Sequence, residues 1–206
     1  MWEKSGLSEL NRRAVSRLSD YLNKFRLYRP EDSEVYCLAY GSNLNEERMK
    51  KRCPKAEVFG TSVIPGYRLL FKRSMTGSYA TIEQDANCNV PVVVYKMTGD
   101  DEQKLDRFEG YPKYYYKREF LLPVWGLTGR KKKLRRNCIA YIMHEYRFLG
   151  EPDEEYFELL DTGYERWGFD KSFLVKAMED SIGRQAATEW LSEYYNDDDE
   201  EEEEHE

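Results

Sequence analysis

Apolar residues recur at every third or fourth position along the first 30 residues of the chain. They are Leu7, Leu10, Ala14, Leu18, Tyr21, Leu22, Phe25 and Tyr28. This spacing predicts an amphipathic helix over residues 5–28, which Ser5 can cap and Pro30 ends. We expect residues 1–30 to form a helical extension whose apolar face covers the rest of the chain or a second copy of it. A homodimer through this helix is therefore one prediction.

Stretches of β-strand composition follow this helix. They cover residues 35–40, 56–64, 67–73, 79–84, 90–97, 114–125 and 137–143. Turn residues separate them, including Pro65 with Gly66 and the polar stretch 87–89. Helical stretches are expected at 46–52 and 100–109, and about three helices fill residues 153–195.

The order of these elements predicts the fold class. Most strands follow one another directly, whereas a parallel sheet needs a helix after nearly every strand. We therefore expect residues 31–195 to form one α+β domain, a small and mostly antiparallel β-barrel flanked by helices.

The acidic residues are concentrated at the end of the chain. The net charge is −7, but residues 197–206 carry nine acidic residues, so the remainder has a net charge of +2. We expect residues 196–206 to be a disordered acidic tail. The basic run RKKKLRR at 130–136 is typical of an exposed hairpin or strand edge, where lysine deters pairing with other sheets. Nucleic-acid binding is the weaker alternative, because the body of the chain is nearly neutral.

Several classes of protein are disfavoured. No apolar stretch is long enough to span a bilayer, and the N-terminus lacks a signal-type apolar block, so we expect a cytoplasmic protein. The four cysteines, at 37, 53, 88 and 138, show no zinc or redox spacing. With His144 and His205 as the only histidines, we expect neither a metal site nor a Ser-His-Asp or Cys-His mechanism, unless His144 serves alone.

The first candidate functional segment is VYCLAYGSNLNEERMKKRC, residues 35–53, in which a tight turn joins a strand to a helix. Gly41 can adopt positive φ and let the backbone approach a ligand, while Ser42 and Asn43 carry short polar side chains. Asn45 is expected to cap the helix. A helix start presents free N–H groups that suit a carboxylate or an oxyanion. A capped helix without a ligand is the alternative.

The second candidate segment is DDEQKLDRFEGYPKYYYKREF, residues 100–120. Gly110 is suited to the left-handed residue that ends a helix, which puts Glu109 in the last helical position. Both the helix dipole and nearby aromatic residues should raise the pKa of this carboxyl, as a general base near neutral pH requires. These aromatic residues are Phe108, Tyr111, Tyr114, Tyr115 and Tyr116. An exposed glutamate at a helix end is the alternative.

Together these segments resemble the γ-glutamyl cyclotransferase family. The resemblance rests on YGSNL after a strand, FEGYPKYYYK after a short helix and AYIMHEY in a late strand, in this order. It extends to GSYATIEQ in the middle and to EYFELLDTGYERWGFDKSFLVKAMED at 155–180, and covers roughly residues 35–180. The helix at 5–28 and the residues after about 182 have no counterpart in it.

The resemblance implies a fold, a reaction and a site. It implies a small β-barrel flanked by helices, with the ligand in a cavity at one barrel end. The reaction needs no metal or cofactor: a γ-glutamyl amine or peptide closes on itself, giving 5-oxoproline and releasing the attached amine or amino acid. The catalytic glutamate would be Glu109, and the substrate contacts would be Tyr40, Gly41, Ser42, Asn43, Leu44 and Tyr141.

Three functions stay open at this point: this enzyme, a non-catalytic binder of γ-glutamyl compounds or amino acids on the same scaffold, and an interaction protein built on the N-terminal helix and the tail. The enzyme is favoured because the substrate's own amine is the nucleophile, so Glu109 alone can shuttle the proton. Glutathione is the least favoured substrate, because the glutathione-specific branch carries a different residue in place of Asn43.

Overall fold

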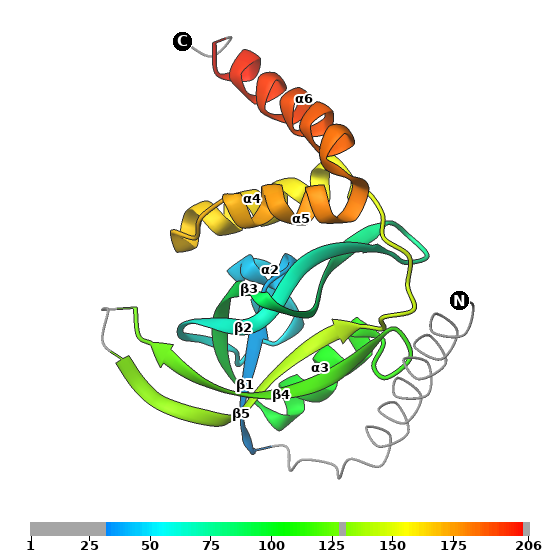
Figure 1. The fold of residues 1–206 in the computed structure, drawn as a ribbon. Coiled ribbons are helices and arrows are strands. Elements are labelled where there is room, and N and C mark those ends of the chain that lie inside the picture. Colours follow the sequence, from blue (N-terminus) through cyan, green and yellow to red (C-terminus); the bar gives the residue numbers. More distant parts are fainter. Residues whose placement is uncertain (1–31, 128–130, 204–206) are drawn as a thin grey trace, which may run out of the picture.

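Five strands form a closed barrel at the centre of the structure (Figure 1). Their order around the barrel is β1 (Glu34–Ala39), β3 (Ser78–Thr98), β2 (Glu57–Arg73), β4 (Tyr115–Trp125) and β5 (Lys131–Met143). Neighbouring strands are antiparallel except β1 and β5, which pair in parallel and close the ring. The computed structural model describes residues 32–127 and 131–203. Within them, the predicted α+β class and the mostly antiparallel barrel are confirmed.

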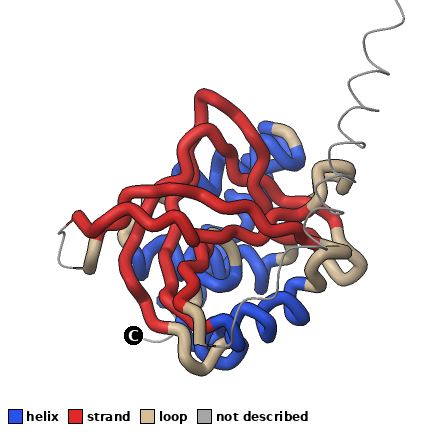
Figure 2. The backbone as a smooth tube through the Cα atoms, turned by 90° about the horizontal axis from the view of Figure 1, so that it is seen from below, coloured by secondary structure: helices blue, strands red, loops and turns tan. Residues whose placement is uncertain are grey.

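Helices lie around the barrel, except the last one, which extends away from it (Figure 1). They are the short 3-10 helix η1 (Ser42–Leu44), α2 (Glu46–Arg52), α3 (Gly99–Glu109), α4 (Glu154–Trp167), α5 (Ser172–Ile182) and α6 (Arg184–Glu203), which packs on α5. α4 packs against η1 and α5 against β2, so both lie on the upper side of the barrel in Figure 1. α3 lies on the lower side of the barrel in Figure 1, where it contacts β1 and β3. Figure 2 shows the barrel from below, with its strands in red and the helices in blue. No helix in the described part of the chain is both long and apolar enough to cross a membrane.

Two predictions concern the ends of the chain. The helix at 5–28, with any dimer formed through it, lies outside the described residues. The tail at 196–206 is expected to be disordered, yet α6 continues as far as Glu203. Glutamate is a good helix former, so an acidic run can prolong a helix that the preceding residues begin. The division of the chain at residues 30 and 195 stays a prediction.

The short stretches expected between residues 56 and 97 form two long strands, β2 and β3. The two strands pair along their length, but the register shifts twice. The first shift lies between Val58 and Gly60, and at the second Pro65 lies opposite Asn89, whereas Tyr67 lies opposite Gln84. The turn-forming residues of both strands therefore meet at one irregularity of the ladder and make no turn. A proline is tolerated at such a place because the regular pairing is already interrupted.

The basic run at 130–136 lies mainly in a strand. β5 begins at Lys131 instead of residue 137, and its first residues pair with β4, with Lys131 opposite Trp125 and Arg135 opposite Leu122. The run therefore follows the connection from β4 to β5, where the hairpin interpretation expects it.

β1 is central to the core. All of its residues except Glu34 are buried, because β3 and β5 flank it and helices cover the barrel. Burial on both faces explains why this strand reads as a continuous apolar run. The residues that follow it, Tyr40 and Gly41, therefore leave the barrel at a well-determined point.

Candidate active site

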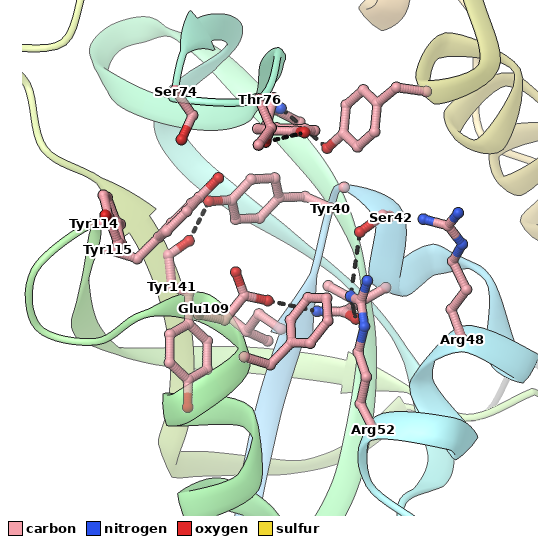
Figure 3. A pocket seen from close by; sticks show the side chains of 18 residues that line it. Tyr40, Ser42, Arg48, Arg52, Ser74, Thr76, Glu109, Tyr114, Tyr115 and Tyr141 are labelled. Carbon is pink, nitrogen blue, oxygen red and sulfur yellow. Dashed lines mark hydrogen bonds between the residues drawn. The ribbon is translucent and has the colours of Figure 1, made fainter.

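A cavity of about 360 Å³ opens where β1 ends (Figure 3). Its wall combines the end of β1, η1, α2, the β2–β3 turn, the end of α3, the start of β4, and single side chains from β5 and α4. Among the described residues, the charged side chains in this wall are Arg48, Arg52 and Glu109. The volume suits a small molecule, to which the wall offers both a carboxylate and guanidinium groups.

The turn predicted from the sequence forms part of this wall. Tyr40, Gly41, Ser42 and Asn43 all line the cavity, and in η1 the Leu44 amide donates to the Gly41 carbonyl at 2.8 Å. The amides of Ser42 and Asn43 precede the first internal hydrogen bond of this helix, so they have no acceptor within it. The structure thus brings the start of a helix to the edge of the cavity.

The glycine of this turn is needed for space. Gly41 has φ −121°, so the turn does not use the positive φ that glycine allows. A Cβ atom added to it would lie 3.2 Å from the hydroxyl oxygen of Tyr156 and 3.3 Å from the Cβ of Ala80. Because glycine lacks this atom, the turn can pack closely against α4 and β3.

The two helices beside the cavity have well-defined ends. The Asn45 side chain accepts a hydrogen bond from the Arg48 amide at 3.0 Å, which confirms the predicted cap of α2. Thr98 caps α3 in the same way. Gly110, with φ 63° and ψ 36°, ends α3 directly after Glu109, as predicted.

Glu109 points into the cavity from the last turn of α3 (Figure 3). Its Oε1 accepts a hydrogen bond from the Asn43 side-chain amide at 3.2 Å. Burial raises the pKa of the Glu109 carboxyl above its ordinary value, while the charge of Arg52 and the Asn43 hydrogen bond partly oppose this. The two segments that the sequence singled out therefore meet at a carboxyl group that binds protons more readily than an ordinary glutamate.

Arg52 is a site residue that the sequence prediction missed. Its guanidinium donates hydrogen bonds to the Asn43 side-chain oxygen and, at 3.2 Å, to Ser42 Oγ. The same group lies 3.6 Å from the centre of the Phe108 ring. Asn43 is thus held between Arg52 on one side and Glu109 on the other. The only sequence signal is that Arg52 lies four residues after Arg48, so one face of α2 carries both.

Tyr40 and Tyr141 are linked to each other in the wall of the cavity. The Tyr40 hydroxyl donates to the backbone carbonyl of Tyr141. The Tyr141 hydroxyl donates at 2.6 Å to Asp106 of α3. Tyr141 therefore lines the cavity while its hydroxyl is engaged with the helix that carries Glu109.

Four further tyrosines line the cavity, Tyr79, Tyr114, Tyr115 and Tyr156. Tyr115 begins β4, and Tyr156 lies in the first turn of α4, where its hydroxyl accepts a hydrogen bond from the Ala80 amide at 3.1 Å. Burial raises the pKa of Tyr115 well above its ordinary value, so its phenol stays protonated near neutral pH. The run of tyrosines after Gly110 indicated Tyr115, whereas no local pattern indicated Tyr156.

Several residues named from the sequence do not line the cavity. Leu44 is fully buried in the core beneath the turn. The Tyr111 ring faces Lys117, with 4.5 Å between its centre and the Lys117 amine, so it is not part of the aromatic rim expected beside Glu109. The Tyr116 hydroxyl donates to Glu145 at 2.6 Å. His144 is buried outside the cavity, with Nε2 2.9 Å from the Pro112 carbonyl oxygen.

Helix α4 holds the turn in place from outside the barrel. The Trp167 indole donates to the Leu44 carbonyl at 2.9 Å. Gly163 lies where the helix crosses η1, and a Cβ on it would be 2.8 Å from the Leu44 Cβ. By packing closely on Leu44, α4 fixes η1 and therefore the neighbouring Asn43.

Replacing Gly163 by Ala is therefore expected to push η1 away from α4. The extra methyl group should lower the free energy of unfolding by about 1–3 kcal/mol, as overpacking in a core does, and should also lower activity. Chemical denaturation and a turnover assay measure the two effects. Thr162→Ala, at an exposed position of the same helix, is the control. Wild-type stability in Gly163→Ala would show that α4 can shift without cost.

Comparisons with known proteins agree with this site. A family model described as gamma-glutamyl cyclotransferase, AIG2-like, matches residues 37–166. Gamma-glutamylcyclotransferase of Homo sapiens is 29% identical over 154 residues, which are 71% of this chain and 79% of that protein. The Bos taurus protein of the same name is 28% identical over 156 residues, which are 72% of this chain and 80% of that protein.

A solved structure named gamma-glutamyl cyclotransferase superposes on this one with a TM-score of 0.59. It is 27% identical in sequence, and the match covers 70% of this chain and 86% of that chain. The span that the family model matches contains the turn at the end of β1, the whole of α3 and the first turn of α4, and therefore every residue that lines the cavity. The chain belongs to the gamma-glutamyl cyclotransferase family.

Proposed function

We propose that the protein is a γ-glutamyl cyclotransferase, an enzyme that converts a γ-glutamyl amine or amino acid into 5-oxoproline and the free amine or amino acid. The observation that carries this proposal is the Glu109 carboxyl, which has a raised pKa and faces a small cavity beside Asn43. Membership of the family supports the same reaction.

Glu109 would carry protons from the attacking amine to the leaving amine during the reaction. The α-amine of the substrate arrives as an ammonium, and the Glu109 carboxylate takes a proton from it. The amine nitrogen then attacks the γ-carbonyl carbon, a new C–N bond forms, and the carbonyl oxygen becomes an oxyanion. The protonated Glu109 gives this proton to the leaving nitrogen as the old C–N bond breaks and the oxyanion becomes a carbonyl again. The ring nitrogen still carries two protons, and the second passes through the Glu109 carboxylate to the released amine, which leaves as an ammonium, so that 5-oxoproline keeps one N–H. Because the ring closure is intramolecular, holding the substrate folded supplies much of the acceleration.

The turn at the end of β1 would hold negative charge. The Asn43 amide suits either the oxyanion or the α-carboxylate of the substrate, since it has no acceptor within η1, whereas the Ser42 amide faces the Tyr156 hydroxyl. Tyr40 and Tyr141 would form walls that keep the substrate folded and exclude water, which strengthens these hydrogen bonds.

Release of 5-oxoproline from a panel of γ-glutamyl compounds tests the proposal. The panel contains γ-glutamyl amino acids, γ-glutamyl amines, the γ-glutamyl isopeptide of lysine and glutathione. Release from any member by the purified full chain supports the proposal, and the fastest substrate names the leaving group. No release by folded protein would overturn it, and calorimetry with the same compounds would then test for a non-catalytic binder.

We also propose that this enzyme works in the cytoplasm. Cys37, Cys53, Cys88 and Cys138 all lie in the described part of the chain, and each is a free thiol. Free thiols suit a reducing compartment. Imaging a fluorescent fusion of the full chain would test the location.

A further inference from the structure

The face of α3 that packs on the barrel is largely polar. Leu105 is the one large apolar side chain that this helix buries, and Asp101 and Glu102 are buried beside it. A helix that packs through a single leucine has little apolar surface to determine how it is rotated on its support. Polar contacts must therefore supply much of the orientation of α3.

Lys117 of β4 provides the strongest of these contacts. Its amine donates to Glu102 Oε1 at 2.7 Å and to Asp106 Oδ2 at 2.9 Å. The Lys117 side chain is only 7% exposed. Tyr141, which lies opposite Lys117 in the β4–β5 ladder, donates to the same Asp106 at 2.6 Å. Two neighbouring strands thus bind one carboxylate of α3.

The spacing of the acidic residues connects this anchor to the cavity. Glu102, Asp106 and Glu109 follow one another at steps of four and three, so they share one face of α3. Rotating or sliding α3 would therefore move Glu109 together with the two carboxylates that Lys117 binds. Such movement is opposed because it would leave the buried Lys117 amine and the buried Glu102 carboxylate without their partners.

We propose that Lys117 is a positioning residue: by binding Glu102 and Asp106 it sets the rotation of α3 on the barrel, and so holds the Glu109 carboxylate beside Asn43. The inference rests on the proposed function for its kinetic readout. Its structural readout, the protection of α3 amides from exchange, does not depend on that function.

The pH dependence of the reaction reports the pKa of Glu109, which depends on how deeply the carboxyl is buried. The charged and titratable groups that interact with it come from several elements. They are Arg52, Tyr40, Tyr115, Tyr156, Cys37 and Cys53. Burial is the largest influence on the Glu109 carboxyl and raises its pKa. If α3 loosens and water reaches the carboxyl, its pKa should fall toward that of an ordinary glutamate.

The test compares Lys117→Met with Lys72→Met and Lys117→Arg. Lys72 is a matched control, because it is a buried strand lysine that pairs with Glu83 and lies outside the cavity wall. The measurements are hydrogen–deuterium exchange of residues 99–111 and the pH profile of kcat/KM for the best γ-glutamyl substrate. Asp106→Asn keeps an acceptor for Tyr141 while weakening the lysine contact, and replaces Lys117→Met if that variant does not fold.

Lys117→Met is expected to speed exchange in α3, to lower kcat/KM by roughly tenfold, and to move the acidic limb of the profile to lower pH. Lys117→Arg should restore most of the activity, and Lys72→Met should leave the limb in place even if it destabilises the fold. Unchanged α3 exchange together with an unchanged limb would overturn the proposal. Inactive wild-type protein would contradict the proposed function instead, and exchange alone would then decide the role of Lys117.

Discussion

Replacing Glu109 by Gln is expected to lower kcat for 5-oxoproline release by a factor of roughly a hundred or more. The amide has nearly the same size, and its oxygen can still face Asn43, but it cannot take a proton from the substrate ammonium. The loss should appear in kcat more than in KM, because proton transfer happens in the transition state and not on binding. Steady-state assays on the best member of the γ-glutamyl panel measure both constants.

Two variants make this result specific. Glu158→Gln, at an exposed position of α4, removes an equivalent charge away from the cavity and should keep full activity. Glu109→Asp keeps the carboxylate but withdraws it by one methylene, so it should retain more activity than the amide if the group acts as a base. Equal rates for wild type and Glu109→Gln would place the base on another residue while leaving the reaction intact.

Local signals in the sequence were enough to predict several elements. The apolar run before Tyr40 predicts β1, and the Asn45 cap together with the basic residues at 50–52 predicts the bounds of α2. Gly110 likewise predicts where α3 ends. In each of these cases the determining interaction lies within a few residues of the element itself, so the neighbouring sequence contains the necessary information.

Other features depend on a partner that is distant in sequence. Pro65 with Gly66 could make a turn or an irregularity in a long strand, and the sequence opposite them decides which. In this structure Asn89 of β3 lies opposite Pro65, so the strand continues. The same holds for Gly41, whose missing side chain makes room for Tyr156 of α4. A single sequence shows that such a residue is unusual but not which contact requires it.

The same distinction between local and distant interactions explains which parts of the site the sequence could predict. Glu109 and the turn at Asn43 each carry a local signal, a carboxylate at the wrong end of a helix and a glycine-containing turn after a strand. Their meeting, at 3.2 Å across 66 positions of sequence, follows from the barrel. Arg52 carries no such signal, because a basic residue in the last turn of a helix is already explained by the helix dipole.

Arg52 therefore provides the second large prediction. Arg52→Met removes the hydrogen bonds to the Asn43 side-chain oxygen and to Ser42 Oγ, and also the positive charge that lowers the Glu109 pKa. The Glu109 pKa should then rise further. Because Glu109 must be deprotonated to accept the substrate proton, the acidic limb of the kcat/KM profile should move to higher pH.

At neutral pH the two losses combine. Fewer molecules carry the carboxylate, and in those that do, Asn43 is no longer held in place, so we expect kcat/KM to fall by roughly a hundredfold. Lys51→Met removes a positive charge from an exposed position of the same helix and should leave the limb where it is. Arg52→Lys keeps the charge but loses the fork of donors, so it should restore the position of the limb without restoring the full rate. An acidic limb that stays in place in Arg52→Met would show that Arg52 and Glu109 are not electrostatically coupled, and that Arg52 acts only through the orientation of Asn43.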